Sequence, residues 1–175
     1  SRYCIWIQTQ KEANKYKCLE ERFNNTRKYR EGSNKLSTRQ KAQTPWKFDE
    51  IRHKGAGLIV PEVSSERREY IVTGITTQNT IISSTARAVY PESPLIFSII
   101  SSKIHIVWVQ AIGGRMRNDI QYGNTLCYNT FPFPTISNQR IAEITQCVFR
   151  ILEEREKHSE KTLAQLYDPD KMPEG

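Results

Sequence analysis

Hydrophobic residues recur at helical spacing in several long stretches of the chain. Residues 11–31 repeat them every three or four positions among charged residues, which predicts an amphipathic helix. Residues 95–112 keep one apolar face throughout, so we expect one continuous helix that Gly113 and Gly114 end. The same spacing predicts two further helices, over 139–158 with Ser137 as its N-cap and over 163–167.

Short runs of β-branched and aromatic residues, separated by turn-forming residues, predict strands between these helices. The runs lie at 4–7, 57–63, 70–75, 81–82 and 126–131. Because each is short, the sequence favours an α+β fold. We expect a small mixed or antiparallel sheet of short strands packed on a long central helix, with helical segments at the N-terminal and C-terminal sides.

The pattern divides the chain into three expected segments. Residues 1–44 form a basic helical segment that ends in a polar linker over 33–44, residues 45–136 form the compact middle, and residues 137–175 are helical. Lys and Arg number 14 against 6 Asp and Glu in residues 1–56, but 12 against 13 in the remainder. A basic half favours a polyanionic partner, nucleic acid first, with a solvated helix face as the alternative.

Cysteine usage and hydropathy exclude several protein classes. The four cysteines form no CxxC pair, so neither a zinc site nor a disulfide framework is indicated, and we expect free, mostly buried thiols. No uninterrupted apolar run reaches about 18 residues, so we expect no membrane partner and a cytoplasmic location. The chain opens without Met or a signal peptide, which suggests a piece of a longer polypeptide.

The sequence lacks the usual marks of a catalyst. It contains no glycine-rich phosphate loop, no GxGxxG, no HExxH and no Asn/Asp-Pro-Pro-Tyr/Phe. The histidines are expected to be structural. Asp170 faintly resembles part of a metal-dependent nuclease site, and Glu62, Glu66 and Glu69 form an acidic cluster that is more typical of surface ion pairs. We therefore expect no catalytic, cofactor-binding or metal site in this chain.

Two polar segments combine the side chains that bond phosphates and base edges in nucleic acids. The first spans residues 63–70 and includes Ser-Ser-Glu-Arg-Arg, and the second spans residues 113–125 and includes Gly-Gly-Arg-Met-Arg-Asn-Asp. At these segments the sequence resembles the target-recognition region of MmeI-type single-chain restriction–modification enzymes and related adenine-specific DNA methyltransferases. The matching strings, in the same order, are Thr44-Pro45-Trp46-x-Phe48, Val60-Pro61-x-Val63 through Arg67, Ser101 through Tyr122, Tyr128 through Pro134, Leu163-x-x-Leu166-Tyr167-Asp168-Pro169 and Met172-Pro173.

The resemblance implies that this chain is one domain of a larger polypeptide whose domains have different functions. This chain would be a sequence-specific recognition module that binds double-stranded DNA and has no cofactor of its own. An upstream methyltransferase domain would bind S-adenosylmethionine and transfer a methyl group to adenine N6, and some members of the family also carry a nuclease. The expected parent is a bacterial restriction–modification protein. Its target adenine in the DNA must be held in register by contacts outside the catalytic pocket.

Arg117 and Asp119 are the sharpest candidates for reading bases. An arginine donates two bonds to guanine O6 and N7, and an aspartate accepts one from cytosine N4, so the pair fits one G·C base pair. A local ion pair between them is the alternative. Asn118, Thr85 and Arg87 are further candidate base-reading residues, with Ser84 beside them. Candidate phosphate or backbone contacts are Ser64, Ser65, Arg67, Arg68, Arg115, Tyr122, Asn124, Arg39 and Lys41.

Two other functions stay open on the sequence alone. A small DNA-processing enzyme, such as a metal-dependent nuclease, would act on DNA without a partner domain. A structural domain that docks other subunits would not need to touch DNA. The basic set Arg22, Arg27, Lys28, Arg30, Lys35, Arg39 and Lys41 is expected to line the DNA backbone if the recognition module is right.

Overall fold

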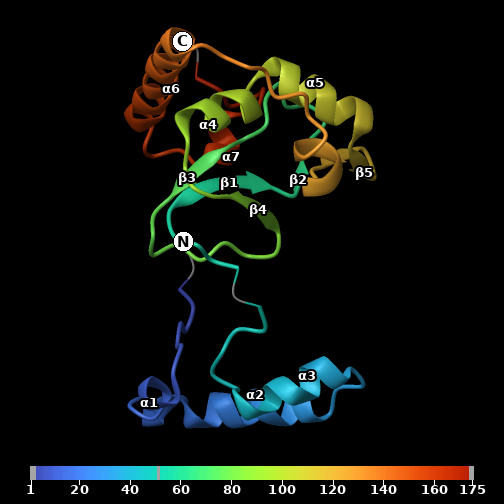
Figure 1. The fold of residues 1–175 in the computed structure, drawn as a ribbon, viewed down its shortest axis with the longest axis vertical. Helices are drawn as coiled ribbons and strands as arrows, with labels where there is room; N and C mark the ends of the chain where they lie inside the picture. Colours follow the sequence, from blue (N-terminus) through green and yellow to red (C-terminus); the bar gives the residue numbers. More distant parts are fainter. Residues whose placement is uncertain (1–2, 51, 174–175) are drawn as a thin grey trace. The chain divides into compact units, whose positions relative to one another are not determined.

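A computed structural model describes residues 3–50 and 52–173 of the chain. The chain divides into two compact units, residues 1–52 and residues 53–175, which we call unit 1 and unit 2 (Figure 1). This division differs from the three expected segments. Residues 45–49 belong to unit 1, and the C-terminal helical segment belongs to unit 2 with the strands.

Unit 1 is helical. Its elements are α1 (Gln10–Ala13), η1 (Lys17–Leu19), α2 (Glu20–Glu31), α3 (Leu36–Gln40) and η2 (Lys41–Gln43). The expected single helix over 11–31 is interrupted after Ala13, where the helix ends at Asn14. No strand forms over 4–7. Instead Ile7 is buried with Ala13 and Trp46, and Leu19 and Phe23 pack against this small core.

The expected linker over 33–44 folds as α3 and η2, and one buried cation binds the backbone at its C-terminal end. Arg30 lies on the inner face of α2 and is only 8% exposed. Its guanidinium donates to the carbonyl oxygens of Lys41 (2.9 Å), Thr44 (2.9 Å) and Lys47 (2.8 Å). A buried charge is tolerated when its donors are satisfied in this way. Arg30 therefore has a structural role, which corrects its expected place on a DNA-binding surface.

Unit 2 contains two small antiparallel sheets. Its strands are β1 (Gly57–Pro61), β2 (Val63–Ser64), β3 (Gly74–Thr76), β4 (Ala86–Val89), β5 (Gly114–Met116) and β6 (Asp119–Gln121). One sheet has the order β3-β1-β4 and the other β2-β6-β5. The expected α+β fold of short antiparallel strands is confirmed, with two sheets in place of one.

Three of the four strands expected in unit 2 are wrong or displaced. Of residues 70–75, only the last two lie in a strand, β3. Residues 81–82 form no strand, and β4 takes the third place in the sheet with β1 and β3. The apolar run 126–131 forms no strand. It follows Gly123 into one turn of π-helix, η3 (Asn124–Tyr128), that places Cys127 in the core. A short apolar run cannot distinguish these outcomes by periodicity.

The helices of unit 2 are α4 (Pro94–Ile100), α5 (Lys103–Ile112), α6 (Asn138–Lys157) and α7 (Leu163–Leu166). The expected continuous helix over 95–112 is wrong. It breaks between α4 and α5 because the Ser102 hydroxyl accepts from the backbone N–H of His105 (3.2 Å) and starts a second helix. The helices expected over 139–158 and 163–167 are confirmed, and the Ser137 side chain caps α6 as expected.

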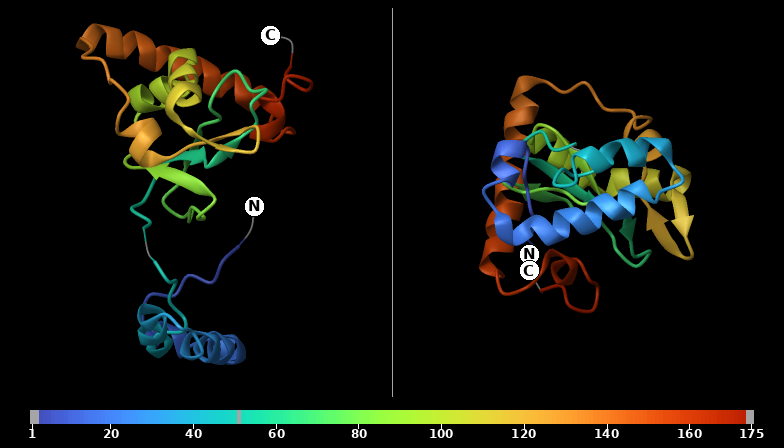
Figure 2. Two further views of the ribbon diagram at one scale, coloured as in Figure 1. Left: turned by 90° about the vertical axis from the view of Figure 1, so that its right-hand side faces the viewer. Right: turned by 90° about the horizontal axis from the view of Figure 1, so that it is seen from below.

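Helices α4, α5 and α6 lie on one side of β1 and β4 (Figures 1 and 2). The core between them contains Leu58, Val60, Ile71, Phe97, Ile100, Ile106, Val109, Ile120, Tyr122, Cys127 and Val148. Within the described residues no single helix is long and apolar enough to cross a membrane; the bent pair α4 and α5 reaches that length and composition only jointly, across a 56° bend.

The cysteines are free, but most of them are not buried. Among the described residues only Cys127 is buried, whereas Cys4, Cys18 and Cys147 are exposed. The Cys127 thiol accepts from the backbone N–H of Gly123 (3.3 Å) inside the core. The expectation of mostly buried thiols is therefore wrong, because residue type alone does not locate a small side chain in a fold.

Candidate nucleic-acid interface

The backbone of Glu62 joins the two polar segments that the sequence singled out, 63–70 and 113–125, to the neighbourhood of the candidates Thr85 and Arg87. Its N–H donates to the carbonyl oxygen of Thr85 (3.0 Å), and its carbonyl oxygen accepts from the N–H of Tyr122 (2.7 Å). Its carboxylate also pairs with the Arg87 guanidinium at 2.6 Å, and both side chains are partly exposed. The segment 62–68, the segment around 85–87 and the hairpin that precedes Tyr122 therefore form one surface region.

Strands β5 and β6 form an exposed hairpin, residues 114–121, at the edge of unit 2 (Figure 2). Met116 pairs with Asp119, so only Arg117 and Asn118 form the turn. Both turn residues are exposed, and Asp119 is partly exposed. A turn this tight at the edge of a unit projects its side chains into solvent, where a partner can contact them.

Arg117 has a backbone φ of 59°, which only glycine adopts freely. Two-residue hairpins with a positive φ at the first position alone usually place glycine there. Within the described residues, the Arg117 guanidinium makes no hydrogen bond or ion pair, so the local pair with Asp119 is not formed. Strained backbone positions are enriched at binding and catalytic sites, so Arg117 is a candidate binding residue.

The base of the exposed hairpin is anchored in the core. Ile120 and Tyr122 are 1% and 2% exposed, and the Tyr122 hydroxyl lies 2.9 Å from Nε2 of His105. His105 is fully buried against the ring of Phe131, and burial lowers its pKa to about 4, so it is neutral at pH 7. Burial also raises the pKa of Tyr122. Tyr122 is therefore a support for the hairpin, which corrects its expected phosphate contact.

The remaining candidates on the hairpin and its neighbour stay accessible. Arg115 is exposed and donates long hydrogen bonds to the carbonyl oxygens of Asn118 (3.3 Å) and Gln110 (3.4 Å). Asn124 is exposed at the start of η3. Both lie within a few residues of the turn, so they are placed to contact whatever the turn contacts.

The segment after β2 holds its two arginines against the C-terminal part of the chain. Arg67 makes two hydrogen bonds of 2.8 Å to the Asp170 carboxylate, both side chains being exposed. Arg68 donates to the Ser64 hydroxyl and to the carbonyl oxygen of Ala164, each at 3.4 Å. Ser64 is only 4% exposed, so it supports Arg68 and does not face solvent, whereas the neighbouring Ser65 is partly exposed.

The acidic side chains that resembled catalytic groups are used in pairs. Asp170 pairs with Arg67, Glu62 with Arg87, and Glu69 with Lys103 at 2.6 Å. The expectation of ion pairs is confirmed for Glu62 and Glu69. Within residues 3–50 and 52–173, no three His, Cys, Asp or Glu side chains come together as metal ligands would.

The segment 83–87 contributes a second accessible edge. The Ser83 and Thr85 hydroxyls lie 2.7 Å apart, and Thr85 is exposed. Arg87 lies on β4, and its pairing with Glu62 leaves its side chain 30% exposed. The backbone hydrogen bonds of Glu62 connect this edge to the base of the exposed hairpin.

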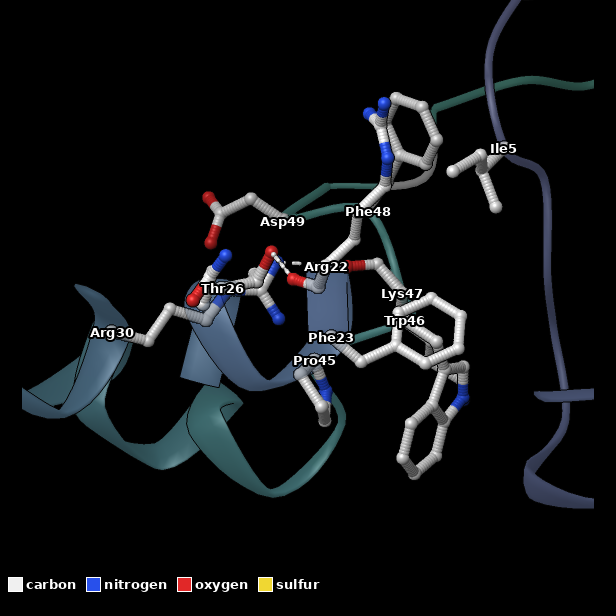
Figure 3. Close-up of a pocket in the computed structure, with 11 residues that line it drawn as sticks. Ile5, Arg22, Phe23, Thr26, Arg30, Pro45, Trp46, Lys47, Phe48 and Asp49 are labelled. Carbon is white, nitrogen blue, oxygen red and sulfur yellow. Dashed lines mark hydrogen bonds between the residues drawn. The ribbon is translucent and has the colours of Figure 1, made fainter. Parts of the chain in front are cut away.

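The candidates in unit 1 are partly committed to internal contacts. Arg39 donates to the carbonyl oxygens of Ser33 (2.8 Å) and Asn34 (3.1 Å). Lys41 pairs with Asp49 at 2.9 Å, and this hydrogen bond lowers the pKa of the Asp49 carboxyl. Unit 1 also holds a shallow hollow of about 470 Å³ (Figure 3). It is lined by Ile5, Arg22, Phe23, Asn25, Thr26, Arg30, Pro45, Trp46, Lys47, Phe48 and Asp49.

Two organising residues were missed by sequence reasoning. Glu62 was assigned only to a surface ion pair, and His105 only to an unspecified structural role. A polar residue directly after a predicted strand is a general signal for a site, and Glu62 carries that signal. Nothing in the sequence around His105 distinguishes it from any other histidine on a helix.

Comparison with known proteins identifies the family to which this chain belongs. The family model described as the target recognition domain of MmeI matches residues 1–135. The chain belongs to this family. The MmeI-type target recognition domain also has a curated relative, the DNA methyltransferase A of Bacillus subtilis (strain 168), with 38% identity over 98% of this chain and 20% of that protein.

A solved structure is similar to the domain in three dimensions. It is the type IIL restriction–modification enzyme MmeI in complex with DNA, with a TM-score of 0.91 and 34% sequence identity. The likeness covers 97% of this chain and 23% of that one. The domain thus spans about a fifth of the length of each of these proteins, and the C-terminal helical part beyond residue 135 is included in both likenesses.

Proposed function

We propose that this target recognition domain selects a sequence in double-stranded DNA by placing its exposed hairpin against the base edges. The observation that carries the proposal is the turn at Arg117 and Asn118, which is exposed, strained at Arg117 and mounted on a buried base. A rigid base matters because base readout needs donors and acceptors held in a fixed register. The similarity to MmeI in complex with DNA supports DNA as the ligand.

Arg117 and Asp119 read one G·C pair in this proposal. The Arg117 guanidinium donates to guanine O6 and N7, and the Asp119 carboxylate accepts from cytosine N4. The absence of an ion pair between them within the described residues leaves both groups available. Asn118 in the same turn and Thr85 and Arg87 on the neighbouring edge contact adjacent bases, Arg87 with its guanidinium oriented by Glu62.

Phosphate contacts come from groups around this centre. Ser65, Arg115 and Asn124 are accessible, and Arg68 is oriented by the buried hydroxyl of Ser64. Arg67 binds a phosphate by exchanging the Asp170 carboxylate for it, and this exchange costs little because the pair is exposed. Such contacts fix the position of a protein on the duplex and carry no sequence information of their own.

The polypeptide that uses this domain is proposed to be an adenine-specific DNA methyltransferase. Its upstream methyltransferase domain binds S-adenosylmethionine and methylates adenine N6, so the cofactor is not held by the residues described above. The name of the Bacillus subtilis relative supports the methyltransferase, and the restriction–modification activity in the name of MmeI leaves a nuclease open. No observation favours a nuclease within this domain or a purely subunit-docking function.

The test is an exchange of the two charges at the reading site. In the full protein, Arg117→Glu with Asp119→Arg should change the preferred base pair at one position of the methylated motif, with about 1–3 kcal/mol of discrimination per bidentate contact. Single-molecule sequencing of modified DNA gives the motif. The matched control exchanges the exposed pair Arg140→Glu with Glu143→Arg on α6, which should leave the motif as it is. An unchanged motif in the first variant would refute the assignment.

A further inference from the structure

The net charge of the chain lies entirely in unit 1. Residues 1–52 carry 13 Lys and Arg against 6 Asp and Glu, which gives +7, the formal net charge of the whole chain. Residues 53–175 carry 13 of each sign and are neutral. The unit that holds the exposed hairpin therefore has no excess positive charge with which to attract DNA.

Several cations of unit 1 are used by the fold itself. Arg30 is buried among three carbonyl oxygens, Arg39 holds two more, and Lys41 pairs with Asp49. Arg52 pairs with Glu50, and Arg27 donates to the side chain of Asn24. These five cations already have partners inside unit 1, so they are left out of the proposed ligand-binding set.

Six other cations of unit 1 are exposed and, within the described part of the chain, have no ion pair or side-chain hydrogen bond. They are Lys11, Lys15, Lys17, Arg22, Lys28 and Lys35. The first three lie within seven residues, across α1, the turn after it and η1. A local excess of positive charge along the chain attracts a polyanion, and each cation that neutralises a phosphate releases a counterion from the nucleic acid.

We propose that unit 1 binds the phosphate backbone of duplex DNA through these six cations. It supplies affinity that does not depend on sequence, and the neutral unit 2 supplies the choice of sequence. Because both units would share one duplex, this inference rests on the proposed function. It also changes the expected set of backbone-binding residues: Arg27, Arg30, Arg39 and Lys41 leave the set, and Lys11, Lys15 and Lys17 join it.

The physical consequence is a separation of salt dependence from specificity. Each phosphate that a cation neutralises contributes about 0.9 to the slope of log Kobs against log salt concentration. Removing Lys11, Lys15 and Lys17 should therefore lower that slope by roughly two to three units. The ratio of affinities for the recognised site and for a site changed at one base pair should stay the same.

The experiment uses the full protein with the substitutions Lys11→Gln, Lys15→Gln and Lys17→Gln together. Because these side chains have no described partner, the far-UV circular dichroism and melting temperature should match the parent. The matched control removes three exposed cations from α6 in unit 2, by Arg140→Gln, Arg150→Gln and Lys157→Gln, so that the change in net charge is identical. Duplex binding is measured by fluorescence anisotropy over a salt series.

The outcomes separate this inference from the proposed function. A lower slope in the unit 1 variant, an unaltered slope in the control and an unchanged methylated motif in both support the inference. If the unit 1 variant keeps the parent slope, or loses no more than the control, its cations form only a solvated face and the inference fails. If the unmodified protein shows no binding to duplex DNA at any salt concentration, the proposed function itself fails.

Discussion

Replacing Arg117 with glycine should stabilise the domain while it removes sequence choice. Arg117 holds a φ of 59°, and an L-residue in the left-handed region costs about 1–2 kcal/mol. Glycine avoids that cost but loses about 0.5–1 kcal/mol more backbone entropy on folding. The expected net gain in the free energy of unfolding is therefore about 0–1.5 kcal/mol. The lost bidentate contact should reduce discrimination by about 1–3 kcal/mol, or roughly 5- to 150-fold.

Two control variants separate backbone strain from side-chain chemistry. Arg117→Ala keeps a side chain at the positive φ, so it should lose sequence choice without gaining stability. Asn118→Gly places glycine where the described backbone has no positive φ, so it should lower stability by about 0.5–1 kcal/mol. Only Arg117→Gly should combine higher stability with weaker discrimination.

The assay follows the part of the fold that carries the hairpin. The Tyr122 amide donates to the carbonyl oxygen of Glu62 at 2.7 Å. Its hydrogen exchange, measured in a urea series, reports the free energy of opening at the base of the hairpin. Methylation of paired duplexes that differ at one base pair reports discrimination. If Arg117→Gly lowers protection, or if it keeps the parent's discrimination, the strained arginine is not held for base readout.

The remaining predictions concern the support beneath the hairpin and the competition for Arg67. Tyr122→Phe leaves buried His105 without its partner and should lower the free energy of unfolding by about 1–3 kcal/mol, measured by urea denaturation. Because burial lowers the pKa of His105 to about 4 from 6.5, its contribution to stability is present above pH 6.5 and is lost as the pH falls toward 4. Urea midpoints across that range should fall more steeply in the parent than in His105→Gln, and equal slopes would contradict this. Asp170→Asn frees Arg67 and should raise duplex affinity in a salt series, whereas weaker binding would show that the pair orders the interface.

The sequence predicted those features that depend on local pattern. The strong 3.6-residue periodicity and the cap at Ser137 located α6. The polar run after Gly114 indicated a surface segment, but its two strands, β5 and β6, were not predicted. Periodicity failed at Ser101 and Ser102 because the apolar face continues through both helices while a single capping hydroxyl decides the break. No composition-based rule detects a bend that one hydrogen bond produces.

The sequence could not predict which polar side chains of the site are buried. Ser64 and Tyr122 have the residue types of phosphate ligands, but long-range pairing of β2 with β6 turns them toward the core. In unit 1 the cations looked equivalent along the chain. Only the fold distinguishes Arg30, which bonds three carbonyl oxygens, from Lys15 and Lys17, which stay exposed.

The most direct measurement of base readout is a photocrosslink from the turn itself. A benzophenone side chain at Asn118 in the full protein, irradiated with a duplex that contains the recognised sequence, should join a base inside that sequence. The same group at Arg150 on α6 is the reference for non-specific capture. A crosslink from position 118 to the sequence-specific bases agrees with the account. Crosslinks from 118 that are no more frequent than those from 150, at salt concentrations where the duplex is bound, would contradict it.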